Sequence, residues 1–158
     1  MNRSLLLPIL LLAASPAPAE EWKQLSGQFS RIVEHRAVVV LTGEDWIRLW
    51  REHTGGSPDF PLPEADFARE AMVAVFSGQR RTTGHSVAMD VRRNAAEDSV
   101  SVVYALRRPA PDSFLSPALT QPYMIRKFPK PSGPLTLERT DRLGASLEKA
   151  LAAPPSFD

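Results

Sequence analysis

Residues 71–76 read Ala-Met-Val-Ala-Val-Phe, the longest uninterrupted apolar run after residue 20. Successive side chains of a strand point to opposite faces of a sheet. A short run without a polar residue therefore predicts a strand that is buried on both faces. We expect this strand to be central, with other parts of the chain packed on each side of it.

Five further segments carry strand patterns, either alternation of apolar and polar side chains or a high content of β-branched residues. They are residues 29–41, 86–92, 99–106, 123–128 and 135–138. Residues 29–41 predict one strand or two short ones, and residues 135–138 predict an edge strand. The polar segment between the second and third predicts a turn, so these two strands should form a hairpin.

One amphipathic helix is predicted before the central strand. Thr42 precedes Asp45 by three residues, which is the spacing of a capping interaction at a helix N-terminus. Trp46 and Trp50 follow one turn apart and give the helix an apolar stripe. Residues 54–58, Thr-Gly-Gly-Ser-Pro, should end the helix because two glycines and a proline do not continue helical hydrogen bonding.

The order of these elements decides the fold class. After residue 71 strands follow strands without intervening helices, which argues against a parallel doubly wound sheet. We expect a mainly β, β-rich α+β domain over residues 20–138. It should be either a small antiparallel sandwich or a sheet packed against the amphipathic helix. Residues 139–158 form a C-terminal tail with a possible short helix, because Leu143, Leu147 and Leu151 recur every four residues.

Residues 1–19 are typical of a cleavable secretory signal peptide. Arg3 supplies a basic start, residues 5–14 are apolar, and Ala17 and Ala19 form an Ala-x-Ala cleavage site. The apolar stretch is shorter than the ~20 residues of a membrane-spanning helix. The chain contains no cysteine, so neither a lipid anchor nor a disulfide is expected. These features predict a periplasmic or extracellular protein with no stable membrane anchor after cleavage.

Composition argues against several function classes. Nineteen Lys and Arg face 18 Asp and Glu, so no long-range field attracts nucleic acid. Neither a phosphate-binding glycine loop nor a nucleophile elbow occurs, and we expect no enzymatic activity and no cofactor. His35, His53 and His85 lie far apart in the sequence, so we expect no metal site. A metal site formed by residues that only the fold brings together is an alternative. The position of His53 near the predicted helix end suggests a residue favoured by the helix dipole.

Three connections between strands have the composition of a recognition surface. Residues 78–85, Gly-Gln-Arg-Arg-Thr-Thr-Gly-His, are too long for a tight turn and should project. Arginine and tyrosine on proline-braced loops give much contact at little entropic cost. The alternative is that basic loops merely solvate strand ends. The candidate partner-binding residues are Arg80, Arg81, Thr82, Thr83, Gly84, His85, Arg107, Arg108, Pro109, Gln121, Pro122 and Tyr123.

A smaller basic cluster lies near the end of another predicted strand. It consists of Arg126, Lys127 and Lys130. Cations at such a place can guard an edge strand against aggregation. The sequence does not distinguish such a guard from a contact site.

Several short motifs follow one another along the chain in an order that is typical of one protein family. They comprise Trp46 and Trp50, then Asp66-Phe67 before the apolar strand, Gly78 with a Thr-Gly turn, Arg108-Pro109, and residues 120–123, Thr-Gln-Pro-Tyr. In this order and spacing, over residues 38–130, the chain resembles the PrcB C-terminal domain family. That family is named after a subunit of a bacterial surface protease complex, which binds the protease and helps to keep it stable. The resemblance implies that the partner is another protein, either a protease or a different cell-envelope component.

One departure from the family pattern concerns the turn after Gly78. The family has Gly-Gly-Tyr there, whereas this chain has Thr83-Gly84-His85. A contact made by the family aromatic would therefore change its chemistry and could become sensitive to pH.

The same turn is also similar to the Thr-Thr-Gly loop of chagasin-type cysteine-protease inhibitors, which insert loops of a β-sandwich into a protease cleft. Residues 82–84 match that loop, and Arg108-Pro109 has the place of a second inhibitor loop. Arg80-Arg81 replaces the Asn-Pro of these inhibitors, and Val87 stands where they have Trp. Direct peptidase inhibition is therefore an alternative function.

Binding of a small ligand between sheet and helix is a third function class. It requires a pocket lined by Trp46, Trp50 or Tyr104. The helical or strand spacing of these aromatic residues predicts instead that they belong to the core.

Overall fold

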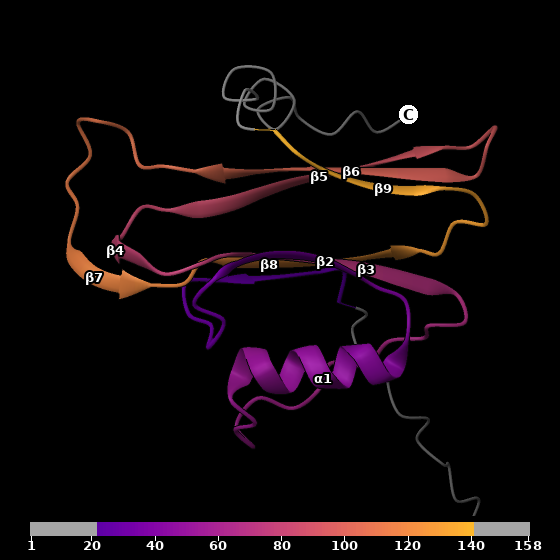
Figure 1. Ribbon diagram of the computed structural model, residues 1–158, viewed down its shortest axis with the longest axis horizontal. Coiled ribbons are helices and arrows are strands. Elements are labelled where there is room, and N and C mark those ends of the chain that lie inside the picture. The colour runs from indigo at the N-terminus through magenta and orange to yellow at the C-terminus, as the bar shows by residue number, and fades with distance from the viewer. Residues whose placement is uncertain (1–21, 141–158) are drawn as a thin grey trace, which may run out of the picture.

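The computed structural model describes residues 22–140, which fold into three layers (Figure 1). One β-sheet lies on a second sheet, and the helix covers the other face of the second sheet. The expected signal peptide at residues 1–19 and the helix candidate at Leu143, Leu147 and Leu151 lie outside the described residues. The elements are β1 (Gln24–Gly27), β2 (His35–Val40), α1 (Gly43–Thr54), β3 (Glu70–Ser77), β4 (Arg80–Thr82), β5 (Ser86–Asn94), β6 (Ser99–Arg107), β7 (Pro117–Thr120), β8 (Tyr123–Pro129) and β9 (Leu135–Arg139).

Both expected architectures occur together in this fold. The four-stranded sheet has the order β1-β8-β3-β2 and is antiparallel throughout. The three-stranded sheet has the order β5-β6-β9, in which β9 pairs with β6 in parallel. Strands β4 and β7 form a separate two-stranded ribbon. The mainly β class is confirmed, with a sandwich on one side of the central sheet and a helix on the other.

Strand β3 is the centre of the fold, as its apolar run predicts. Val73 and Val75 face the three-stranded sheet and pack in one core cluster with residues such as Val102. Met72 and Phe76 face α1 and pack in a second cluster with Trp46. Strand β3 therefore belongs to two cores at once, which explains why it contains no polar residue between its ends.

Helix α1 begins and ends where the sequence predicts. The Thr42 hydroxyl accepts a hydrogen bond from the Asp45 amide at 3.2 Å. Gly55 adopts a left-handed conformation at φ 70° and caps the C-terminus. The indole nitrogens of Trp46 and Trp50 donate to backbone carbonyls of the following loop, at 2.9 and 3.0 Å. The Trp stripe thus packs the helix on the sheet and also fixes the Pro-rich loop that follows.

His53 has a different environment from the one its sequence position suggests. A helix dipole favours the protonated form of a C-terminal histidine. In the structure the ring is 6 % exposed, lies 4.2 Å from the Tyr123 ring between centroids, and its Nδ1 is 2.9 Å from the Ser30 hydroxyl. His53 does lie in the last turn of α1, as predicted, but burial lowers its pKa to about 4, which favours the neutral ring over a cation stabilised by the dipole.

Three strands were not predicted, and one was predicted too long. Strands β1, β4 and β7 contain three or four residues each and have no clear alternation. Within residues 29–41 only His35–Val40 forms a strand. Short strands such as β1 are formed by pairing, here with β8, rather than by their own pattern. No helix among residues 22–140 has the length and apolar character needed to cross a membrane.

Candidate functional site

The three connections singled out from the sequence meet at one end of the sandwich (left in Figure 1). Strand β3 ends there at Ser77, β5 begins at Ser86, β6 ends at Arg107 and β8 begins at Tyr123. The segment before β2 joins them, because the Gln121 amide donates to the Gln28 carbonyl at 2.7 Å. We call residues 28–33, 78–85 and 107–123 the strand-end surface.

The connection at residues 78–85 is not a free loop. Residues 80–82 form strand β4, which pairs with β7. The Thr83 amide donates to the Ser116 carbonyl at 3.1 Å, and the Ser116 amide donates to the Thr83 hydroxyl at 3.1 Å. The Thr120 hydroxyl donates to the Thr82 carbonyl at 3.2 Å. The projection expected from the sequence is therefore a braced two-stranded ribbon, which holds its side chains in place.

The candidate residues divide into internal braces and exposed groups. Arg80 donates to the Ser77 carbonyl at 2.6 Å and so closes the end of β3. Pro122 is buried, and Tyr123 lies against His53, where burial raises the pKa of Tyr123. The exposed members are Arg81, Gly84 and Arg108, while Thr82, Thr83, His85, Arg107, Pro109 and Gln121 are half-buried.

Exposed apolar side chains at the same end were missed from the sequence. The Phe114 side chain is 98 % exposed, and Phe29, Val33 and Leu119 are also largely exposed. Scattered exposed apolar residues are common, and Leu41, Ile47, Phe60 and Leu62 are exposed elsewhere, but none of them is as exposed as Phe114. A signal existed at Phe114, because it lies in the segment Pro-Ala-Pro-Asp-Ser-Phe, where no strand or helix period requires an apolar residue.

The charge of the strand-end surface is mainly positive. Its residues 28–33, 78–85 and 107–123 contain five arginines and a single carboxylate, Asp112. The pKa of His85 is lowered, first by burial and then by repulsion from Arg80 and Arg108. This shift favours the neutral imidazole, so the arginines provide the charge of this surface.

Gly84 is a conformational requirement of this surface. Its φ is +85°, and a Cβ atom at this position would lie 2.8 Å from the Pro109 Cβ. We expect Gly84→Ala to lower the free energy of unfolding by about 2 kcal/mol, from backbone strain and the clash together. Gly56→Ala is the matched control, since Gly56 has φ +71° but no atom within 4 Å of its added Cβ.

The control should cost about 1 kcal/mol, because it imposes only the backbone strain. Urea denaturation of both variants measures the difference. Equal destabilisation of the two variants would show that the turn at Gly84 does not pack tightly against Pro109.

The strand-end surface combines arginine side chains with exposed apolar side chains on a braced backbone. Within residues 22–140, no three His, Cys, Asp or Glu side chains are grouped so that they could hold a metal ion.

Comparison with known families identifies the central part of the chain. Residues 71–129 match the family model described as PrcB C-terminal. The match runs from β3 to the end of β8 and includes all the candidate partner-binding residues, so the resemblance seen in the sequence is confirmed. Residues 38–70, with α1, lie outside the matched range. Neither the curated proteins nor the solved structures contain a significant match.

Proposed function

From the match of residues 71–129 to the PrcB C-terminal family, we propose that this chain is an exported, non-enzymatic module that binds another protein. The partner is a protease or another component of the cell envelope, which the module holds or stabilises. The single observation that carries the proposal is the exposed Phe114 side chain on a surface that also presents Arg81 and Arg108.

An aromatic residue with arginines nearby has the composition of a binding hot spot. The apolar ring loses water-exposed area when it enters a pocket of the partner, and the guanidinium groups contact carboxylates at its rim. We therefore infer a partner surface with an apolar pocket and an acidic border. Charge complementarity of this kind raises the association rate and the specificity more than the affinity.

The backbone of the strand-end surface lowers the cost of binding. The β4–β7 ribbon and the hydrogen bonds between Thr83 and Ser116 fix the segment that carries Arg81. Prolines at 109, 111 and 117 restrict the segment on either side of Phe114. Less conformational entropy is then lost when the partner binds.

A variant with Arg81→Ala, Arg108→Ala and Phe114→Ala tests the proposal. We expect it to capture at least tenfold less of the specific partner from a cell-envelope extract than the unchanged protein captures, as measured by quantitative mass spectrometry. The reason is that it removes the exposed anchor and two exposed charges without touching the core.

The matched control carries Arg48→Ala, Arg92→Ala and Phe60→Ala. These residues are also two exposed arginines and an exposed phenylalanine, but they lie outside the strand-end surface. The control should keep the partners of the unchanged protein, and thermal melting should show that both variants are folded. If the strand-end variant and the control variant captured the same proteins in the same amounts, the strand-end surface would not be the binding site.

Direct inhibition of a peptidase is a second candidate, favoured by one contact. The Thr-Thr-Gly turn and the Arg-Pro segment that resemble inhibitor loops are neighbours in the structure, because Gly84 packs against Pro109. Titration of a papain-like protease with the purified protein distinguishes the two functions. If the purified protein slows peptide cleavage and the Gly84→Ala variant slows it less, the protein is an inhibitor. If cleavage is unchanged, inhibition is excluded and the function as a binding module is retained.

A further inference from the structure

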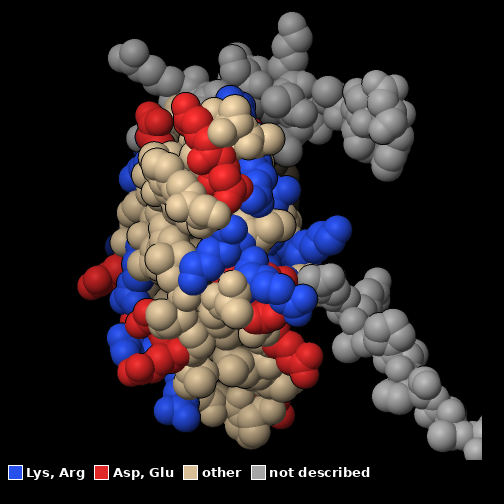
Figure 2. All heavy atoms as spheres, turned by 90° about the vertical axis from the view of Figure 1, so that its right-hand side faces the viewer, with Lys and Arg blue, Asp and Glu red and all other residues tan. Residues whose placement is uncertain are grey.

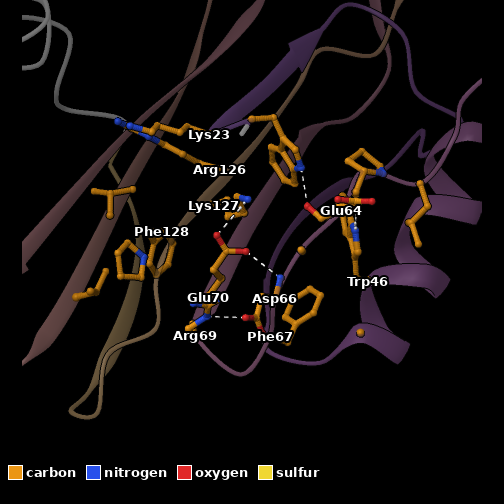
Figure 3. A pocket seen from close by; sticks show the side chains of 18 of the residues that line it. Lys23, Trp46, Glu64, Asp66, Phe67, Arg69, Glu70, Arg126, Lys127 and Phe128 are labelled. Atoms are coloured by element: carbon orange, nitrogen blue, oxygen red, sulfur yellow. Dashed lines mark hydrogen bonds and ion pairs between the residues drawn. The ribbon is translucent and has the colours of Figure 1, made fainter. Parts of the chain in front are cut away.

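The end of the sandwich opposite to the strand-end surface contains an open cleft of about 1390 Å³ (Figure 3). It lies where β3 begins at Glu70 and β8 ends at Pro129. Its apolar lining includes Trp22, Trp46 and Phe67. Trp46 thus belongs to the core and also lines a cleft. A pocket lined by Trp46 was the feature that binding of a small ligand between sheet and helix would require.

Three carboxylate residues, Glu64, Asp66 and Glu70, line the cleft, and the last two are paired with cations. Glu70 Oε1 lies 3.1 Å from Lys127 Nζ in an ion pair whose side chains are 17 % and 7 % exposed. Glu70 Oε2 accepts a hydrogen bond from the Asp66 amide at 2.9 Å. Asp66 Oδ2 in turn lies 2.6 Å from Arg69 Nε. These contacts are drawn in Figure 3, and among residues 22–140 they leave Glu64 as the one carboxylate of the lining without an ion pair.

Two cations that line the cleft have no such compensation. Arg126 Nη1 donates to the Met89 carbonyl of edge strand β5 at 3.2 Å, which is a neutral acceptor. Among residues 22–140, neither Arg126 nor Lys23 lies within 4 Å of a carboxylate oxygen. Lys23 lies opposite Lys127, whose amide donates to the Lys23 carbonyl at 2.9 Å, and is therefore one register position from Arg126, which pairs with Gln24. Both side chains extend the same way in Figure 3, and Figure 2 shows basic side chains gathered on this face.

Protection of an edge strand does not explain Arg126, although Lys23 directly precedes β1, which is an edge strand of its sheet. Strand β8 lies inside the four-stranded sheet, hydrogen-bonded to β1 on one side and to β3 on the other. Arg126 and Lys127 therefore do not guard an exposed edge, which was one explanation open from the sequence. Lys127 forms an ion pair with Glu70, whereas Arg126 and Lys23 line the cleft.

We infer that this cleft binds an apolar peptide segment that carries a carboxylate. Arginine and lysine form charge-assisted hydrogen bonds with carboxylate oxygens. Indole and phenyl side chains such as Trp22 and Phe67 then contact the apolar residues beside the carboxylate. The cleft is larger and more open than the ~300 to 1,000 Å³ of typical small-molecule pockets, so a length of chain fits it better than an enclosed small ligand.

The carboxylate can come from a chain terminus or from an acidic side chain, and three acetylated peptides distinguish these sources. The first is acetyl-Gly-Ser-Phe-Leu-Phe with a free carboxylate, the second is its C-terminal amide, and the third is acetyl-Gly-Asp-Phe-Leu-Phe amide. Binding of each is followed by the fluorescence of the tryptophans and by calorimetry. If only the first peptide binds, the cleft recognises the carboxylate of a chain terminus. If the third peptide binds, the cleft recognises the carboxylate of an acidic side chain.

The double variant Lys23→Gln and Arg126→Gln tests the residues. We expect it to bind the carboxylate peptides at least tenfold more weakly and to lose the salt dependence of binding, because the two charges are gone. Arg48→Gln with Arg92→Gln removes the same charge outside the cleft and should bind as the unchanged protein does. Thermal melting of both variants shows that folding is retained.

The inference does not rest on the proposed function, since it uses residues at the other end of the molecule. The strand-end variant with Arg81→Ala, Arg108→Ala and Phe114→Ala should keep its peptide affinity, and the cleft variant should keep its envelope partners unless these also bind the cleft. Two results would overturn the inference. One is that none of the three peptides binds, and the other is that the cleft variant binds them as tightly as the unchanged protein.

Discussion

Phe76→Ala is expected to lower the free energy of unfolding by about 3 to 5 kcal/mol, the cost of removing a buried aromatic ring. Phe76 is 0 % exposed on strand β3. Its ring lies 5.6 Å from the His53 ring and 6.2 Å from the Tyr123 ring between centroids. Alanine would leave a cavity between helix and sheet that these neighbours can only partly fill, because both are held by other contacts.

Phe114→Ala makes the matched comparison, because the same atoms are removed from a side chain that is almost fully exposed. We expect its free energy of unfolding to stay within about 0.5 kcal/mol of the unchanged protein. Urea denaturation at pH 7.5 measures both variants. If Phe114→Ala were as destabilising as Phe76→Ala, Phe114 would belong to a core rather than to a binding surface.

Acid is expected to destabilise the protein through His53. The folded-state pKa is lowered to about 4 by burial, whereas the unfolded chain has the ordinary value of 6.5. The unfolded state therefore takes up a proton first as the pH falls. The stability contributed by neutral His53 is fully present above pH 6.5 and is lost as the pH falls toward 4. The total loss is about 3 kcal/mol, of which about 2 kcal/mol appears between pH 7.5 and pH 5.

The window from pH 7.5 to pH 5 lies above the ordinary pKa values of Asp and Glu, about 3.9 and 4.3, so the change of stability within it reports mainly on histidine. Urea denaturation across this window gives the slope of stability against pH. His53→Gln should remove most of the slope, although it also lowers stability at every pH. His85→Gln is the control, because His85 is less buried and should leave most of the slope in place. A slope that His53→Gln leaves intact would assign the acid sensitivity to other groups.

The two proposed binding surfaces have a common structural basis. The strands run the length of the sandwich, and β3 ends at the strand-end surface and begins at the cleft. A core on each face of β3 holds both ends in fixed positions. One module could therefore contact two parts of a partner, or two partners, without a conformational change.

The sequence was sufficient wherever a local pattern matched a local physical requirement. The apolar run at residues 71–76 identified the central strand because burial on both faces excludes polar residues. Thr42, Gly55 and the Trp stripe placed α1, since caps and helical periodicity involve residues a few positions apart. The hairpin of β5 and β6 followed from alternation on both sides of a polar turn.

What only the tertiary structure decided depends on residues far apart in the chain. Strands β1, β4 and β7 exist because distant partners supply their hydrogen bonds, and the parallel pairing of β9 has no sequence pattern of its own. The buried, neutral state of His53 opposes the suggestion from its helix position, because desolvation by distant side chains outweighs the local dipole. The extent to which Phe114 is exposed, and the lack of a carboxylate within 4 Å of Lys23 or Arg126 among residues 22–140, also became visible only in the fold. A sequence shows which charges and rings a chain contains, but folding determines which of them are covered or paired.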